Sequence, residues 1–406
     1  MTNNYLRYTL LIMLTIGSLW IISCDANDDG AESDPCNPVG VAGGIISSEA
    51  FGSYDPEQVQ TYLRLFGAPP GLAPEFAVDA IRIVYKSRDK HGELVSASGV
   101  LFVPTGIDTL ALLSVQHGTE FKRDQVGSAN PLYAFDGLIS AMAGYMVFEP
   151  DYLGLGSSEG IHPYLHAELS ANAVIDALRA ARIYACQEGL ILSDKLFMAG
   201  YSEGGFATMA AHRAIEKDYS EEFQLTAVAP MAGPYDLLAT TRNILNRQAY
   251  SNPAYMAYIV TAYNDVYGWD RIDDIFREPY ASRIPLLLNG DYAGDDINDS
   301  LTTSIRSLFA EQFLTDFFAA GEVDIKNALV ENSLLDWGPI APVKLYHGTS
   351  DSTVYFQNSL TVFDSLTSNG ARDVELIPLP GANHGTGAFP AYYLALTWFD
   401  SLKSGN

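Results

Sequence analysis

Residues 195–212 read KLFMAGYSEGGFATMAAH. The apolar start of this stretch is typical of a buried strand, and its end favours a helix. Between them GYSEG, residues 200–204, places a serine on a sharp strand-to-helix turn that exposes the hydroxyl. The flanking glycines fit this turn, because a Cβ atom at Gly200 or Gly204 would crowd it. The stretch therefore predicts Ser202 as a nucleophile.

A second Gly-x-Ser-x-Gly sequence occurs at residues 156–160. Its serine, Ser158, comes several residues after the preceding apolar run, and Pro163 follows soon afterwards. Proline has no backbone N–H, so a helix cannot open here as it can after Ser202. We therefore interpret residues 156–160 as a loop.

A serine hydroxyl is a weak nucleophile until a neighbouring base takes its proton, so Ser202 requires a histidine and an acid that orients it. His384 and Asp351 each follow a predicted strand, where side chains project from the carboxyl end of a parallel sheet. Their order, Ser, Asp, His, is the one that the strand-to-helix serine turn requires. Asp236, after the preceding strand, is the alternative acid.

An anionic tetrahedral intermediate needs N–H donors that are already in place. The backbone amide of Glu203 is one candidate, because it lies directly after the nucleophile at the start of a helix. The loop after the strand 110–115 supplies the second from Thr119 or, as an alternative, Gly118. Asp151, in the turn after another strand, is expected to brace that turn rather than to perform chemistry.

Apolar runs alternate with helical patterns through the rest of the chain, which indicates an α/β fold with a mostly parallel, doubly wound sheet. Two runs joined by a charged turn predict an antiparallel hairpin at the leading edge of the sheet, residues 80–86 and 97–103. Further strands are expected at residues 110–115, 144–149, 195–199, 225–229, 343–346 and 374–379, with helices at 168–184 and 392–402.

The strand–helix alternation breaks off after Pro234 and resumes near residue 343. Residues 237–340 are therefore predicted to be a helical cap insertion within one domain, 39–406. Aromatic residues such as Tyr255 and Tyr258 are frequent there. They either line a pocket above the predicted site or form the core of the insertion.

Residues 76–403 resemble an α/β-hydrolase. The GYSEGG turn together with EPDYLGLG, residues 149–156, is similar to the secretory lipase and esterase branch of that superfamily. The Gly-rich His-Gly-Gly-Gly loop of the hormone-sensitive-lipase-like group has no counterpart, so the acyl-site details of that group do not carry over. The resemblance implies hydrolysis of small-molecule or lipid carboxylic esters through an acyl-enzyme, with no metal or organic cofactor.

Two other functions remain open at this point. A serine peptidase of the same fold would use the same residues, because the fold does not determine the substrate. A surface binding protein without catalytic activity would have no need for a serine, an acid and a histidine in these places.

The N-terminus has the features of an export signal. Residues 1–24 combine Arg7 with an apolar run and end in Ser23-Cys24, which resembles the lipobox of bacterial lipoproteins. We expect Cys24 to be lipidated, which would attach an exported protein to the bacterial cell envelope, although an ordinary cleaved signal is the alternative. Residues 25–38 have almost no apolar content and are predicted to be a flexible acidic tether.

The net charge of −26 and the lack of a Lys/Arg cluster argue against nucleic acid as a partner. The acidic runs near residues 25 and 290 lack the ligand spacing of a calcium loop, so no metal site is predicted. Cys36 and Cys186 could form a disulfide in an oxidising compartment, or Cys186 could be a buried thiol.

Overall fold

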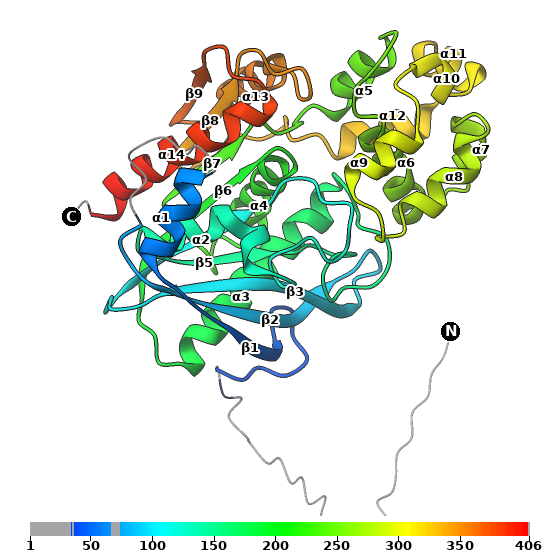
Figure 1. The fold of residues 1–406 in the computed structure, drawn as a ribbon. Helices are drawn as coiled ribbons and strands as arrows, with labels where there is room; N and C mark the ends of the chain where they lie inside the picture. Colours follow the sequence, from blue (N-terminus) through cyan, green and yellow to red (C-terminus); the bar gives the residue numbers. More distant parts are fainter. Residues whose placement is uncertain (1–33, 35, 66–73, 405–406) are drawn as a thin grey trace, which may run out of the picture. The chain divides into compact units, whose positions relative to one another are not determined.

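The computed structural model describes residues 34, 36–65 and 74–404. These residues form a nine-stranded sheet with the order β1-β2-β3-β5-β4-β6-β7-β8-β9 (Figure 1). The strands are β1 (Ile45–Tyr54), β2 (Val78–Arg88), β3 (Leu94–Pro104), β4 (Leu110–Gln116), β5 (Tyr145–Pro150), β6 (Leu192–Tyr201), β7 (Ala227–Met231), β8 (Val343–Gly348) and β9 (Val374–Leu379). Strands β1, β2, β3 and β5 pair antiparallel, and all pairs from β5 to β9 are parallel. The predicted doubly wound α/β sheet is confirmed.

The edge of the sheet differs from the prediction. The hairpin of β2 and β3 forms as expected, but β1 pairs with β2 on its outer side and is the actual edge strand. Most side chains of β1 are exposed, so its sequence lacks the continuous apolar run by which the inner strands were recognised.

Helices cover both faces of the sheet, and consecutive strand residues feed two separate cores. On β4, Leu112 packs in one core and Leu113 in the other. The first core also contains residues of α3 (Ala167–Gln187), α4 (Glu203–Asp218) and α13 (Phe356–Ser368). The second contains residues of α2 (Phe135–Met142) and α14 (His384–Lys403). Burial on both faces explains why the central strands are apolar throughout.

Between β7 and β8 the chain forms eight helices and no strand. They are α5 (Leu237–Leu245), α6 (Pro253–Tyr267), α7 (Ile272–Ile275), α8 (Tyr280–Leu287), α9 (Gly294–Ser300), α10 (Ile305–Leu308), α11 (Glu311–Phe318) and α12 (Val323–Glu331). Figure 1 shows α6 to α12 grouped together, apart from the helices that flank the sheet. We call residues 237–340 the helical insertion.

Near the N-terminal end of the described chain, a disulfide joins Cys36 to Cys186 of α3. The Gln187 side chain also donates to the backbone carbonyl of Cys36. A short 3-10 helix η1 (Pro131–Ala134) precedes α2, and α1 (Pro56–Leu65) follows β1. The predicted signal segment 1–24, its Cys24 and most of the predicted tether 25–38 lie outside the described residues. Within those residues, no helix has the length and apolar character needed to cross a membrane.

Candidate active site

The turn between β6 and α4 holds Ser202 in a strained conformation. Its φ of 60° and ψ of −121° lie in a region that non-glycine residues rarely adopt. The Ser202 N–H donates to the carbonyl of Met231 on β7 (2.9 Å), which ties the turn to the sheet. A Cβ atom on Gly204 would lie 1.9 Å from the carbonyl oxygen of Gln116, so only glycine fits there. The surrounding backbone therefore fixes the position of the serine.

Ser202, His384 and Asp351 form a hydrogen-bonded chain. The Nε2 atom of His384 lies 2.9 Å from Ser202 Oγ, and its Nδ1 atom lies 2.6 Å from Asp351 Oδ2. His384 is the first residue of α14, which begins eight residues before the predicted helix start at residue 392, because Asn383 caps it with a capping box. Three residues far apart in the sequence thus meet in the order expected of a nucleophile, a base and an acid.

Asp351 follows β8 and has partners for both carboxylate oxygens. Its Oδ1 atom accepts the backbone N–H groups of Thr353 (2.9 Å) and Val354 (3.0 Å). Its Oδ2 atom is shared by His384 and the buried His347, whose Nε2 lies 3.2 Å away. Burial alone would raise the pKa of Asp351, but the hydrogen bonds from the two histidines outweigh it and lower the pKa to about 2.

His347 was not predicted as a site residue, although it stands four positions before Asp351. The Nδ1 atom of His347 lies 2.7 Å from the Ser359 hydroxyl, and its Nε2 atom lies 2.9 Å from the carbonyl of Val354. Since a carbonyl can only accept, Nε2 carries the proton and Ser359 donates to Nδ1. His347 therefore holds Asp351 in place without competing for the proton of His384.

Asp236, the alternative acid, and Ser158, the serine of the second Gly-x-Ser-x-Gly sequence, have other hydrogen-bond partners. Asp236 caps α5 and accepts the N–H of Ala239 (2.9 Å), which is a structural role. Ser158 is buried in a loop, and its carbonyl accepts from the Arg123 guanidinium. Residues 156–160 lie in the middle of the long loop between β5 and α3, so Ser158 is not on a tight strand-to-helix turn, and the predicted loop is observed.

The loop after β4 lies against the turn that holds Ser202. A Cβ atom on Gly118 would lie 4.0 Å from the Cβ atom of Ser202. The ring of His117 packs on Tyr152 with centroids 4.3 Å apart, and the Tyr152 hydroxyl donates to the His117 carbonyl (3.1 Å). Thr119, the predicted second donor of the oxyanion hole, therefore belongs to a loop whose backbone is held beside the serine.

Asp151, directly after β5, is fully buried and braces the turn that follows this strand. Its carboxylate accepts from the Ser98 hydroxyl (2.5 Å) and from the Ser128 N–H (3.1 Å). Burial raises its pKa despite these bonds. The contacts agree with the expected bracing role.

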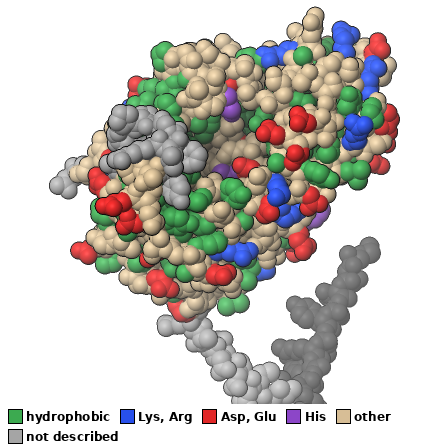
Figure 2. Space-filling view, in the orientation of Figure 1, with side chains coloured by type: hydrophobic (Ala, Val, Ile, Leu, Met, Phe, Trp, Pro, Cys, Tyr) green, Lys and Arg blue, Asp and Glu red, His purple; other side chains and the backbone are tan. Residues whose placement is uncertain are grey.

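An apolar pocket of about 50 Å³ opens beside Ser202. A second cavity of about 20 Å³ lies further into the helical insertion, and Thr241, Met256 and Ile259 line both. Tyr255 lines the first pocket, whereas Tyr258 is buried and stacks on Tyr164 with ring centroids 4.7 Å apart. Figure 2 shows the surface hollowed in the middle of the visible face, with histidine atoms (purple) along the hollow.

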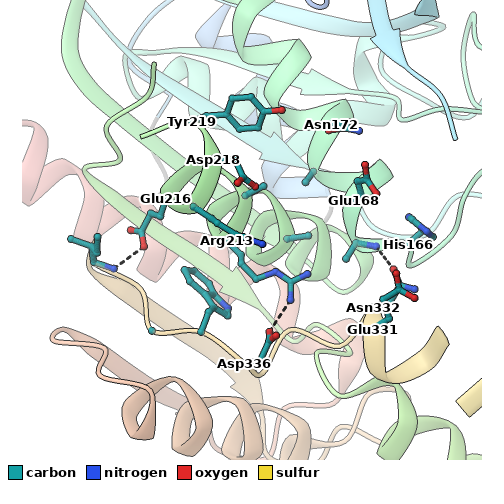
Figure 3. A pocket seen from close by; sticks show the side chains of 18 residues that line it. His166, Glu168, Asn172, Arg213, Glu216, Asp218, Tyr219, Glu331, Asn332 and Asp336 are labelled. Atoms are coloured by element: carbon teal, nitrogen blue, oxygen red, sulfur yellow. Dashed lines mark hydrogen bonds and ion pairs between the residues drawn. The ribbon is translucent and has the colours of Figure 1, made fainter. Parts of the chain in front are cut away.

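A cavity of about 690 Å³ lies apart from these residues, between α3, α4 and the segment after α12 (Figure 3). Its lining is mixed polar and apolar, and includes Arg213, which pairs with Asp336 (3.1 Å), and Glu168. None of the predicted site residues lines it. Cavity volume alone would thus have pointed away from Ser202. Within the described part of the chain, no group of three or more His, Cys, Asp or Glu residues could hold a metal ion.

The sheet order, the strand-to-helix turn at Ser202 and the helical insertion after β7 are those of an α/β-hydrolase. A comparison with family models matches residues 136–406 to the secretory lipase family. The chain therefore belongs to this family and is a hydrolase of the lipase and esterase type.

Solved structures agree with this assignment. The ligand-bound form of the rice cell wall degrading esterase LipA from Xanthomonas oryzae is 30% identical, with a TM-score of 0.79 over 89% of this chain and 98% of that chain. A Legionella pneumophila protein assigned as a hydrolase is 28% identical, with a TM-score of 0.83 over 89% and 99%. Candida antarctica lipase A in its closed state shares the fold, at 17% identity and a TM-score of 0.67 over 91% and 86%. A comparison with curated protein sequences finds no match.

Proposed function

We propose that the protein is a serine ester hydrolase in which Ser202 is the nucleophile, His384 the general base and Asp351 the acid. The observation that carries the proposal is the continuous hydrogen-bonded chain from Ser202 Oγ through both nitrogens of His384 to Asp351. The strained backbone of Ser202 supports it further, because strain of this kind is typical of functional sites.

The geometry suits an acyl-enzyme reaction. As Ser202 Oγ attacks the ester carbonyl, its proton moves to His384 Nε2, and Asp351 stabilises the imidazolium through Nδ1–H. The backbone amides of Glu203 and Thr119 bind the oxyanion. When the intermediate collapses, His384 returns the proton to the leaving alcohol, and a water molecule then releases the acid by the same proton path.

The apolar pocket beside Ser202 is suited to the acyl group of the substrate. The pocket has room for only a few carbon atoms, so a short acyl chain fits without movement of the helical insertion. The second cavity would extend the pocket for a longer chain if Met256 and Ile259 moved apart. The substrate class is therefore a carboxylic ester with a short apolar acyl group.

We also propose that the protein is exported and attached to the cell envelope through a lipid on Cys24. The Cys36–Cys186 disulfide supports export, because such bonds persist in oxidising compartments. The match to a family of secretory lipases points in the same direction.

Labelling with a fluorophosphonate tests the catalytic proposal. This reagent reacts with a serine whose proton is removed by a positioned base, so mass spectrometry should find the adduct on Ser202 and not on Ser158. Ser202→Ala should abolish labelling and ester hydrolysis, while Ser158→Ala should retain both. An adduct on Ser158, or none on either serine, would refute the proposal.

A further inference from the structure

The residue next to the nucleophile carries a buried carboxyl group that the proposed mechanism does not use. The side chain of Glu203 is 2% exposed, and so is that of its partner His162. The Oε1 atom of Glu203 lies 2.6 Å from His162 Nε2, while its Oε2 atom is buried without a hydrogen-bond partner. A lone carboxylate in this place would repel the negative charge that develops on the oxyanion.

The hydrogen-bond geometry determines how many protons the pair holds. The Nδ1 atom of His162 lies 2.8 Å from the carbonyl of Leu153, which can only accept, so Nδ1 carries a proton. The short contact between Nε2 and Glu203 requires another proton between them. Either His162 is an imidazolium and Glu203 a carboxylate, or both are neutral. In both cases the pair has no net charge.

His162 also contacts the two tyrosines that bond the loop after β4, which carries His117 and Thr119. Its ring stacks on Tyr152, with centroids 5.7 Å apart, and Tyr152 bonds the His117 carbonyl. On another side it faces Tyr164 at 6.2 Å, whose hydroxyl lies 3.1 Å from Thr119 Oγ1. His162 is therefore linked to both proposed oxyanion donors: to Glu203 directly, and to Thr119 through Tyr164.

We infer that His162 is a positioning residue: it shares one proton with Glu203 and so keeps the group beside the oxyanion amide neutral and fixed. This inference rests on the proposed function, because it requires an oxyanion at Ser202. His162 does not touch the reacting atoms. Its effect reaches the reaction through the Glu203 carboxyl and the helix start that carries the Glu203 amide.

Other ionisable groups lie around the pair, but among the described residues none of them donates a hydrogen bond to the Glu203 carboxyl. Burial, with a smaller contribution from Glu203, raises the pKa of Glu120 to about 7. The hydroxyls of Tyr152, Tyr164, Tyr255 and Tyr258 stay protonated, since burial raises the pKa of each. Arg123 acts on Tyr258 as the nearby cation.

The test compares His162→Gln with the double variant His162→Gln/Glu203→Gln. In the single variant Glu203 loses the base that shares its proton, so ionisation would leave an uncompensated negative charge beside the oxyanion amide. The ratio of kcat/KM between single and double variants, measured with 4-nitrophenyl butyrate, should be near one at about pH 6 and fall severalfold by about pH 9. The loss should lie in kcat, because the charge acts on the transition state. Dividing by the double variant removes the titration of His384.

A ratio that does not change with pH would mean that His162 only fills space, and it would overturn the inference. If the single variant is too unstable to assay, unfolding is measured instead. The free energy of unfolding should then be lower in the single than in the double variant, and this difference should grow with pH. A difference that stays constant would equally overturn it.

His212→Gln is the matched control, since His212 forms a buried pair with Glu216 (2.8 Å) on the same helix α4. Its kcat/KM relative to wild type should not depend on pH. Fluorophosphonate labelling of Ser202 in the wild type is read separately. Failure to label refutes the proposed function, whereas labelling with a constant ratio refutes only the role of His162.

Discussion

The Nδ1 atom of His384 lies 2.6 Å from the Oδ2 atom of Asp351, within hydrogen-bond distance. This contact makes Nδ1 the protonated nitrogen and leaves the lone pair of Nε2 pointing at the Ser202 hydroxyl, 2.9 Å away. Because the pKa of Asp351 is lowered to about 2, the carboxylate stays charged throughout the range in which a histidine base works. Any loss of activity on mild acidification must therefore come from another group.

The first prediction concerns this contact. Asp351→Asn removes the charge and lets the amide favour the wrong imidazole tautomer, so kcat should fall about 10⁴-fold. Asp236→Asn is the control, because Asp236 only caps α5, and it should cost at most about 1 kcal/mol of stability. Steady-state kinetics with a short aryl ester checks both. Equal losses of kcat in the two variants would show that Asp351 is not the specific acid partner of His384.

The second prediction concerns acyl-chain length. Ile259 lines both the pocket beside Ser202 and the cavity behind it, so Ile259→Trp should close the passage between them. Activity on an acetate ester should be kept, while kcat/KM for an octanoate ester should drop about tenfold or more. Leu286→Trp, at a site 68% exposed on the helical insertion, is the control. A parallel loss on both esters would show that the cavity does not hold the acyl chain.

The second prediction extends to Tyr255 and Tyr258, which the sequence left open as lining of a pocket or as core of the insertion. The structure separates them, since Tyr258 is buried in an aromatic stack with Phe121 and Tyr164 and Tyr255 lines the pocket. Tyr258→Ala should therefore lower stability by about 3 to 5 kcal/mol, as truncation of a buried aromatic does. Tyr255→Ala should change the ratio of activities on short and long acyl esters with a smaller loss. Thermal unfolding and an ester series distinguish the two effects.

The inner strands and the Ser202 turn could be predicted from the sequence because their signals are local. A strand buried on both faces is a continuous apolar run, and the turn needs its glycines within a few residues of the serine. The edge strand β1 could not, since its side chains are mostly exposed. The pairing of His162 with Glu203 joins residues 41 positions apart, and only the fold brings them together.

The third prediction concerns the membrane anchor. Cys24→Ser should move the protein from the membrane fraction to the soluble fraction of cells, because the lipid would have no attachment site. Specific activity should not change, since Cys24 is remote in sequence from Ser202, Asp351 and His384. Fractionation followed by an esterase assay checks this. A variant that stays in the membrane fraction would argue for another mode of attachment.

The fourth prediction concerns the disulfide. Cys36 and Cys186 are 150 residues apart in the sequence, and closing a loop of that size restricts the unfolded chain. Cys36→Ser, made in a protein that also carries Cys24→Ser, should lower the free energy of unfolding by about 2 to 5 kcal/mol. A reducing agent should lower the Tm of the parent protein and leave that of the variant unchanged. Equal sensitivity in both proteins would mean that the bond does not stabilise the fold.

The fifth prediction concerns the buried Glu149 on β5. Its side chain is almost fully buried, its Oε2 atom has no hydrogen-bond partner, and burial is the main cause that raises its pKa well above 4.5. The folded protein therefore keeps this carboxyl protonated at pH values where the unfolded chain releases the proton. The contribution of Glu149 to the free energy of unfolding should be most favourable below about pH 4.5 and become less favourable as the pH rises above that value. Glu149→Gln, which is neutral at every pH, should match the wild type in acid and become progressively more stable than it at neutral and alkaline pH. Denaturant unfolding between about pH 4 and pH 9 measures this difference. A difference that is constant across that range would show that Glu149 is ionised in the folded protein, with its charge compensated by its surroundings.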